Sequence, residues 1–310
     1  MLREGLLWLS EQQVVFRFLR TNSLARKFAS RFVAGETIDA AINAVREVNR
    51  RGITASLDLL GESVTRESEA AAARDEYLRI LERVSESGAA ANVSVKLTQM
   101  GLDIGDGVCL ANMTRILEKA RQLNTFVRID MEDSAYTQRT LDLFADRVIG
   151  RYRSVCGVVI QACLRRSAAD IERLIALDAR VRLCKGAYLE PPEVAFLDKA
   201  EVDRSYRVLM ERLLERGHYP ALATHDPRMI AHARAYARHR GIPPEHFEFQ
   251  MLYGVRRDLQ EELRRAGYNV RVYVPFGTQW YPYLMRRLAE RPANIVFILG
   301  SIAKEAVAGV

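Results

Sequence analysis

Cysteine is scarce in this sequence of 310 residues, and its placement gives it no evident structural role. The four cysteines (Cys109, Cys156, Cys163 and Cys184) include no pair separated by two residues, which argues against a zinc site or a disulfide framework. Long apolar runs are missing too, because stretches such as 295–299 fall far short of the ~20 residues that a membrane-spanning helix needs. The first residues lack the apolar core and cleavage site of a secretory signal. We therefore expect a cytoplasmic protein with no metal site.

Neither sign of charge dominates the sequence. Lysine and arginine together number 46 against 39 aspartates and glutamates, so the net charge is only +7, and the arginines are spread along the chain. A nucleic-acid site needs clustered basic residues with aromatic stacking platforms, which the sequence does not offer. Solvated helix faces account for most of the arginines. We expect no nucleic-acid partner, whereas a loose peripheral contact with the anionic inner face of the cell membrane stays open.

The composition, with 49% apolar and 27% charged residues, is that of an ordinary globular protein. Eight short runs rich in β-branched residues alternate with longer stretches in which apolar residues recur three and four positions apart. Strands that alternate with helices pair in parallel through right-handed crossovers. Eight such units favour an α/β protein with a closed (β/α)8 barrel over an open doubly wound sheet. The runs cover 53–61, 92–99, 126–133, 157–164, 180–188, 219–226, 247–252 and 269–277.

Helices are expected on both sides of the eight repeats. Two precede the first strand, from about Gln12 to Phe32 and from Ile38 to Arg50, and one follows the last, from about Gln279 to Glu290. No linker, low-complexity tract or change of composition divides the chain, and α/β barrels commonly exceed the usual domain length. We predict a single domain over 1–310, with N-terminal helices in 1–50 and the barrel in 51–310.

Polar residues stand near the C-terminal ends of the predicted strands, where a barrel carries its reactive groups. Each alone has an ordinary alternative, such as a salt bridge or a structural hydrogen bond at the barrel rim. Together they would bring many charged and amide groups to one mouth. They are Lys96, Asp130, Gln161, Arg182, Lys185, Thr224, His225 and Gln250.

The predicted last helix has a polar face. Tyr283, Arg286, Arg287 and Glu290 follow the spacing i, i+3, i+4 and i+7, so they share one side of the helix. Two guanidinium groups beside a phenol suit a carboxylate ligand, because the arginine fork matches carboxylate geometry. An exposed face with Arg–Glu pairing explains the spacing equally well, and four other arginine doublets occur in the chain. The spacing alone leaves both readings open.

Several motifs, taken in order along nearly the whole chain, resemble those of proline dehydrogenase, the flavin enzyme family that begins proline catabolism. The resemblance implies a distorted (β/α)8 barrel with the last helix across its mouth. Several long motifs in the right order are a specific signal, unlike a single short pattern. The motifs are VSVKLTQMG (93–101), RIDMED (128–133), RLCKGAY (182–188), ATHD (223–226), FEFQMLYG (247–254) and the stretch 270–294.

The resemblance also implies roles at a substrate site. Arg286 and Arg287, aided by Lys96, would hold the carboxylate of proline. Asp130 would lie beside Lys96 and orient the site. The side chains expected to pack against the proline ring are Leu252, Tyr273 and Tyr283.

A cofactor site for FAD follows from the same resemblance. Arg182 would reach the central-ring nitrogen of the flavin and Gln161 would face its pyrimidine edge. A positive charge near the ring would stabilise the reduced flavin, and Gly186 would let the backbone approach the cofactor closely. The remaining FAD contacts would be Met131, Lys185, Gly186, Ala187, Thr224, His225, Gln250 and Glu290.

The implied reaction is the FAD-dependent oxidation of L-proline to 1-pyrroline-5-carboxylate, the first step of proline degradation to glutamate. No G-x-G-x-x-G or G-x-x-x-x-G-K-[ST] pattern occurs, so barrel loops would hold FAD. No second redox centre is evident, so electrons would pass directly to an acceptor, which the family suggests is a quinone. The chain has no room for the aldehyde dehydrogenase module of bifunctional relatives. We therefore expect a separate pyrroline-5-carboxylate (glutamate semialdehyde) dehydrogenase to consume the product.

Two other functions compete with this interpretation. A Schiff-base aldolase on the same fold would use Lys96 or Lys185 as its nucleophile. A basic protein that binds nucleic acid or an anionic membrane would show salt-dependent binding without any flavin. Neither alternative accounts for the ordered motifs.

Overall fold

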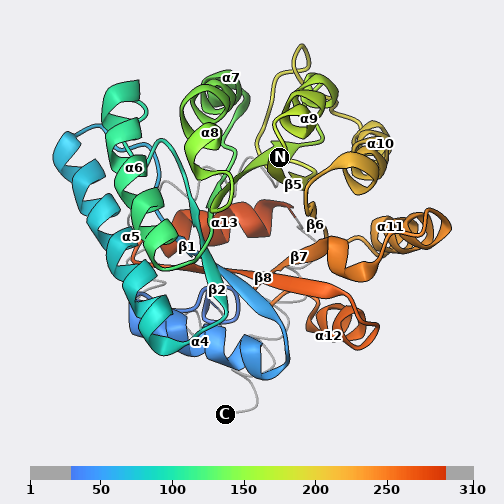
Figure 1. Cartoon of the computed structure of the whole chain (residues 1–310), viewed down its shortest axis with the longest axis horizontal. Helices are drawn as coiled ribbons and strands as arrows, with labels where there is room; N and C mark the ends of the chain where they lie inside the picture. Colours follow the sequence, from blue (N-terminus) through green and yellow to red (C-terminus); the bar gives the residue numbers. More distant parts are fainter. Residues whose placement is uncertain (1–28, 291–310) are drawn as a thin grey trace, which may run out of the picture.

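The computed structural model describes residues 29–290, with the backbone alone for 286–290. Eight parallel strands close into a barrel in the order of the sequence, and a ring of helices surrounds them (Figure 1). The predicted (β/α)8 barrel is therefore confirmed. The strands are β1 (Thr54–Leu59), β2 (Ala91–Val95), β3 (Val127–Ile129), β4 (Cys156–Gln161), β5 (Arg180–Cys184), β6 (Ala221–Ala223), β7 (Glu248–Leu252) and β8 (Asn269–Phe276).

Helices fill the connections between the strands, as parallel pairing requires. A π-helical turn over Phe144–Val148 joins α7 to α8. A short 3-10 turn over Pro244–His246 precedes β7. The helices are α4 (Ile38–Arg50), α5 (Glu67–Ser87), α6 (Asp106–Gln122), α7 (Ser134–Leu143), α8 (Ile149–Tyr152), α9 (Ser167–Ala176), α10 (Lys199–Arg216), α11 (Pro227–His239), α12 (Arg257–Arg265) and α13 (Trp280–Glu290).

The predicted bounds of the helices that flank the eight repeats can be compared with the structure. The N-cap of α4 is Thr37, whose side chain accepts a hydrogen bond from the backbone N–H of Ala40, so this helix begins where the sequence predicts. The predicted helix after the barrel is α13. Most of the helix predicted over 12–32 lies outside the described residues. Its described end is helical only at Ala29, and the chain turns through Phe32, so the predicted boundary is three residues too long.

The two faces of the barrel strands differ in chemistry. Residues that face the helices are apolar, as at Leu57 and Val93, and join one large buried cluster. Residues that alternate with them face the barrel interior, and many are polar or charged. Arg271 of β8 donates from Nε to both carboxylate oxygens of Glu248 on β7, at 3.0 and 3.2 Å. Barrel interiors are usually filled by branched apolar residues, so buried charge here needs partners within the interior.

Burial and the neighbouring polar groups shift the pKa of Glu248 in opposite directions. Burial alone would raise the pKa of its carboxyl group, but Arg271, Gln250 and Arg128 together outweigh burial and lower the pKa. Glu248 is therefore ionised near neutral pH and can only accept hydrogen bonds. This pair lies on the strands that lead up to the site described below.

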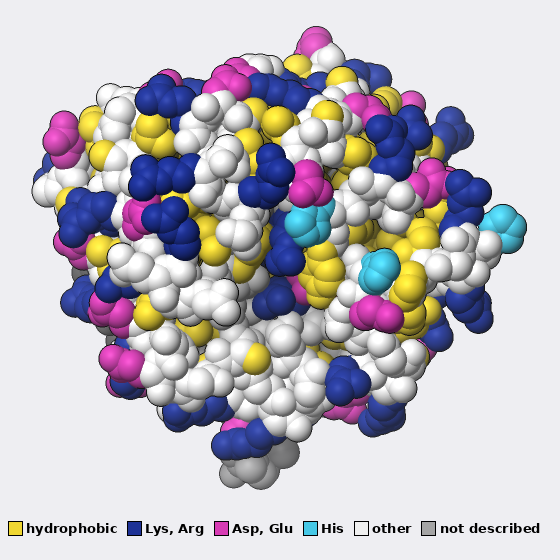
Figure 2. All heavy atoms as spheres, in the orientation of Figure 1, with side chains coloured by type: hydrophobic (Ala, Val, Ile, Leu, Met, Phe, Trp, Pro, Cys, Tyr) yellow, Lys and Arg dark blue, Asp and Glu magenta, His cyan; other side chains and the backbone are white. Residues whose placement is uncertain are grey.

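The outer surface carries both signs of charge in close proximity. Figure 2 shows dark blue and magenta side chains next to one another over the face in view. Ion pairs such as Lys119–Glu82 at 2.7 Å account for part of this pattern. Exposed pairs of this kind contribute little to stability. Within residues 29–290, no helix combines the length and apolar character that crossing a membrane requires.

Candidate active site

A cavity of about 680 Å³ opens at the C-terminal ends of the strands. Its size is typical of a small-molecule or cofactor site. The side chains of Arg286, Arg287 and Glu290 lie outside the described residues. Every other residue that the sequence predicts for the site lines the cavity: Lys96, Asp130, Met131, Gln161, Arg182, Lys185, Gly186, Ala187, Thr224, His225, Gln250, Leu252, Tyr273 and Tyr283.

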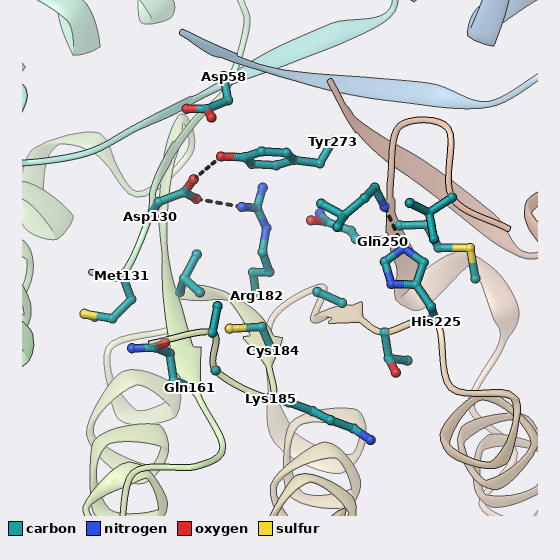
Figure 3. Close-up of a pocket in the computed structure, with 18 of the residues that line it drawn as sticks. Asp58, Asp130, Met131, Gln161, Arg182, Cys184, Lys185, His225, Gln250 and Tyr273 are labelled. Atoms are coloured by element: carbon teal, nitrogen blue, oxygen red, sulfur yellow. Dashed lines mark hydrogen bonds and ion pairs between the residues drawn. The ribbon is translucent and has the colours of Figure 1, made fainter. Parts of the chain in front are cut away.

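Three of these residues meet in the cavity, one from the end of β3, one from β5 and one from β8 (Figure 3). Arg182 donates from Nη1 to Asp130 at 2.6 Å and from Nη2 to the hydroxyl of Ser94 at 3.1 Å. The phenol of Tyr273 donates to the other Asp130 oxygen at 2.7 Å. Burial and the charges of Asp130 and Asp58 raise the pKa of Tyr273 well above its usual range. The phenol therefore keeps its proton and remains a donor.

Lys96 is ion-paired with Asp58 of the neighbouring strand. Its Nζ lies 3.0 Å from Oδ1 of Asp58, and both side chains are buried. Burial opposes the charged form of Lys96, but Asp58, Asp130 and Glu62 outweigh it and raise the pKa of the ammonium group. Asp130 thus acts on Lys96 only through its charge. Lys96 stays protonated at neutral pH, so it lacks the free amine that a Schiff-base aldolase needs.

Asp58 is a site residue that the sequence analysis did not select. It lies near the end of β1, within the first predicted run and beside the strand that ends before Lys96. An acidic residue at the end of one strand, next to a lysine at the end of the neighbouring strand, was the available signal. The second carboxylate oxygen, Oδ2, is buried and has no hydrogen-bond partner among the described residues.

Gln161 and Gly186 form one side of the cavity. The amide nitrogen of Gln161 donates to the backbone carbonyl of Glu132 at 2.8 Å, so its own carbonyl oxygen remains as an acceptor. Gly186 has a φ of +110°, and a Cβ at this position would lie 2.3 Å from Sγ of Cys163. Only glycine fits there, which explains the glycine of the KGA turn.

Lys185 points away from the central cluster (Figure 3). Its ammonium group contacts Asp203 of α10 and lies 3.0 Å from Asp226, the N-cap residue of α11. The sequence analysis missed Asp203, because a helix residue 18 positions away gives no local signal. Lys185 is thus held between two carboxylates at the edge of the cavity.

The ends of β6 and β7 are tied together across the cavity wall. Nε2 of His225 accepts a hydrogen bond of 2.8 Å from the backbone N–H of Leu252. Because that backbone group can only donate, the His225 ring carries its proton on Nδ1. The side-chain amide of Gln250 donates to Glu248, and the backbone carbonyl of Gln250 accepts from the N–H of Thr224 at 3.1 Å. These contacts fix the polar groups that face the cavity.

Comparison with known proteins shows which family has this sequence pattern. The family described as Proline dehydrogenase matches residues 41–298. This chain belongs to the proline dehydrogenase family. Proline dehydrogenase 1 of Bacillus subtilis is 41% identical over 305 residues, which cover 98% of this chain and all of that protein. Proline dehydrogenase of Deinococcus radiodurans is 40% identical over 306 residues, with 97% and 98% covered.

A solved structure shows the same architecture. Proline utilization A (PutA) from Bdellovibrio bacteriovorus, inactivated by N-propargylglycine, aligns with a TM-score of 0.81 and 28% identity over 90% of this chain. The match covers 34% of that longer protein, so this chain spans about a third of it. Membership of the proline dehydrogenase family removes both the aldolase and the basic binding protein as accounts of the chain.

The cavity fits the flavin on which proline dehydrogenases depend. Among the described lining residues, five are lysine or arginine and three are aspartate, so the lining favours an anionic ligand. The carbonyl of Gln161 adds an acceptor, because the amide nitrogen of this side chain is already engaged. These polar groups suit the hydrogen-bonding edge of a flavin.

The contacts of Lys185 with Asp203 and Asp226 predict how this chain responds to acid. The pKa values of Asp203 and Asp226 are lowered, because hydrogen bonds from lysines and the backbone outweigh burial. Stability from such carboxylates is present above their unfolded pKa of about 3.9 and is lost as pH falls through the lowered folded value. Lys185→Met therefore shifts the midpoint of acid unfolding, followed by circular dichroism, to higher pH.

Lys199 provides the matched control for that measurement. It also contacts Asp203, at 2.6 Å, but its side chain is 71% exposed. Lys199→Met should therefore move the acid midpoint by less than Lys185→Met does. Equal shifts in the two variants would show that Lys185 has no special place in the cluster.

Proposed function

We propose that this chain catalyses the FAD-dependent oxidation of L-proline to 1-pyrroline-5-carboxylate, the first step of proline degradation to glutamate. One observation carries the proposal. In this member of the proline dehydrogenase family, Lys96 and Arg182 are both buried in the cavity wall, and each is ion-paired with a carboxylate. Lys96 would attract an anionic substrate, and Arg182 would stabilise the negative charge that develops on a reduced cofactor.

Cofactor binding is assigned to the part of the cavity beyond Arg182. FAD supplies the two-electron oxidising capacity when it is bound. Arg182 would lie nearest the reacting end of the cofactor and Gln161 would accept a hydrogen bond from its polar edge. Lys185 and His225 would contact the more distant parts. The remaining proposed contacts are Met131, Gly186, Ala187, Thr224, Gln250 and Glu290.

Substrate binding is assigned to the part of the cavity between Lys96 and α13. Lys96 would attract the carboxylate of proline, and Tyr273, Tyr283 and Leu252 would close on the ring and exclude water. Proline loses a hydride from the carbon next to nitrogen and a proton from nitrogen, which leaves a C=N bond. Arg182 and Tyr273 both hold Asp130, so the wall facing this carbon is preorganised.

A quinone is proposed as the electron acceptor and a separate pyrroline-5-carboxylate dehydrogenase as the consumer of the product. A lipid-borne quinone would bring the enzyme to the inner face of the cell membrane, where the net charge of +7 favours a loose contact. Vesicle co-sedimentation at low and high salt tests this contact. Absence of sedimentation at every salt concentration excludes it.

Product analysis tests the proposed reaction. The purified chain, supplied with FAD, L-proline and a water-soluble quinone, should form a product two hydrogens lighter than proline, detected by mass spectrometry. Replacing the quinone by oxygen should slow the formation of this product. Failure to form it with any acceptor would exclude the reaction, and faster formation with oxygen would exclude the quinone.

Arg286 and Arg287 are proposed to hold the substrate carboxylate. Charge-assisted hydrogen bonds of this kind contribute about 1.5–3 kcal/mol each. Replacing either arginine by methionine should therefore raise the KM for proline about tenfold or more, while FAD remains bound. The KM and the flavin content are measured on the same preparations. Wild-type kinetics in both variants would mean that these side chains do not contact the substrate.

A further inference from the structure

The segment that precedes α4 crosses the C-terminal end of the barrel. This segment, residues 29–36, is called the strap below, and it lies outside the family match over 41–298. Two backbone hydrogen bonds of 2.9 Å tie it to the end of β8 and the turn before α13. The N–H of Ala34 donates to the carbonyl of Pro275, and the N–H of Gly277 donates to the carbonyl of Gly35. The strap and the start of α13 are therefore fixed to each other.

Side chains of the strap also pack on α13. The indole N–H of Trp280 donates to Glu36 at 3.1 Å. Phe32 of the strap lines the cavity together with Tyr283 and Leu284 of α13. The strap thus reaches the same chamber that α13 covers. Its apolar contacts form a buried cluster of Ala29, Val33, Leu60, Trp280, Tyr281, Tyr283, Leu284 and Met285, with Phe32 beside it.

A third contact joins the strap to the turn after β7. Gly254 has a φ of +74°, and a Cβ built on it would lie 1.8 Å from the carbonyl oxygen of Arg31. The residues on either side of it, Tyr253 and Val255, line the cavity. The backbone of the strap therefore rests directly on a cavity-forming turn, at a distance that only glycine allows.

We propose that the strap is a positioning element of the substrate site: it fixes the first turn of α13, and thereby the helix face that receives the substrate carboxylate. The inference rests on the proposed function, because that function places Arg286 and Arg287 on this face. A helix is stiff over its eleven residues, so the anchored first turn determines where the next turn lies. Loss of the anchor moves the carboxylate-binding groups, whereas Asp130 keeps its own hydrogen bonds from Arg182 and Tyr273.

Gly254→Ala tests the strap, with Gly241→Ala as the matched control. Gly241 has a similar φ of +66°, but a Cβ there meets nothing within 4 Å. Both substitutions impose the same backbone strain, and only the first displaces the strap. Gly254→Ala should raise the KM for L-proline about tenfold or more with kcat within twofold of wild type. Gly241→Ala should leave both unchanged.

This split between KM and kcat separates positioning from stability. A merely structural strap would reduce the active fraction, and so lower kcat per mole of chain, while KM stayed constant. Hydrogen exchange at the N–H of Gly277 provides a readout independent of activity, and it should be faster in Gly254→Ala than in Gly241→Ala. Equal KM values in the two variants, or equal exchange at Gly277, would overturn the proposal. Wild-type protein that fails to oxidise proline would instead refute the proposed function, and the exchange result would stand.

A second pair of variants decides the case if Gly254→Ala does not fold. Glu36→Leu removes the acceptor for Trp280, whereas Glu36→Gln keeps an acceptor oxygen in the same place. Glu36→Leu should raise the KM for proline about threefold or more, and Glu36→Gln should restore it to within twofold of wild type. No difference between Glu36→Leu and Glu36→Gln would overturn the role of the strap.

Discussion

Arg182→Met is expected to lower kcat for proline oxidation by about two to three orders of magnitude in enzyme that still holds FAD. The Arg182 guanidinium is buried and lies against Asp130 and Ser94. A unit charge about 4 Å from developing negative charge contributes about 4 kcal/mol at an effective dielectric constant of about 20. The substitution removes that stabilisation, and Asp130 also loses its ion-pair partner.

The midpoint potential of the flavin and the kcat, measured together, identify why Arg182→Met loses activity. Arg182→Met should lower the midpoint potential of the bound flavin, because the reduced form loses a nearby positive charge. Arg182→Lys keeps the positive charge but not the fork geometry of the guanidinium group. Compared with Arg182→Met, it should therefore restore more of the midpoint potential than of kcat. A flavin-loaded Arg182→Met enzyme with unchanged potential and kcat would contradict the role proposed for this residue.

Lys96→Met is expected to destabilise the fold by about 3 kcal/mol or more, because it leaves a buried carboxylate without its counter-charge. The Asp58 side chain is 1% exposed, and one of its oxygens already has no hydrogen-bond partner among the described residues. The free energy of unfolding from urea titration at neutral pH measures the effect. The same variant should bind proline far more weakly.

A double-mutant cycle separates the two effects of Lys96. Asp58→Asn removes the buried charge, so Lys96→Met combined with Asp58→Asn should recover most of the lost stability. The affinity for proline should not recover, because no cation is restored. Strictly additive stability losses would show that Lys96 and Asp58 are not energetically coupled, and recovery of proline affinity would show that Lys96 does not bind the carboxylate.

The barrel could be predicted from the sequence because its signal is local and repeated. Eight apolar runs, each followed by a helical pattern, leave few alternatives. Polar residues at strand ends converge in any such barrel, which is why the predicted residues that the structure describes meet in one cavity. Their roles remain proposals.

Pairings between distant residues could not be predicted in the same way. Lys96 and Asp58 are 38 positions apart and Lys185 and Asp203 are 18 apart, so each contact depends on how the barrel closes. The strap has no periodic pattern of its own. Its place follows from tertiary packing, of which Gly254 is one local sign.

The most direct test of the central claim is the visible absorption spectrum of the FAD-loaded protein, recorded without oxygen before and after addition of L-proline. The account predicts that the flavin bands bleach on addition of L-proline, and that a water-soluble quinone then restores them. D-proline, which presents the carboxylate from the opposite face of the ring, serves as the control and should bleach the bands far more slowly. A bound flavin whose spectrum does not change with L-proline would contradict the account.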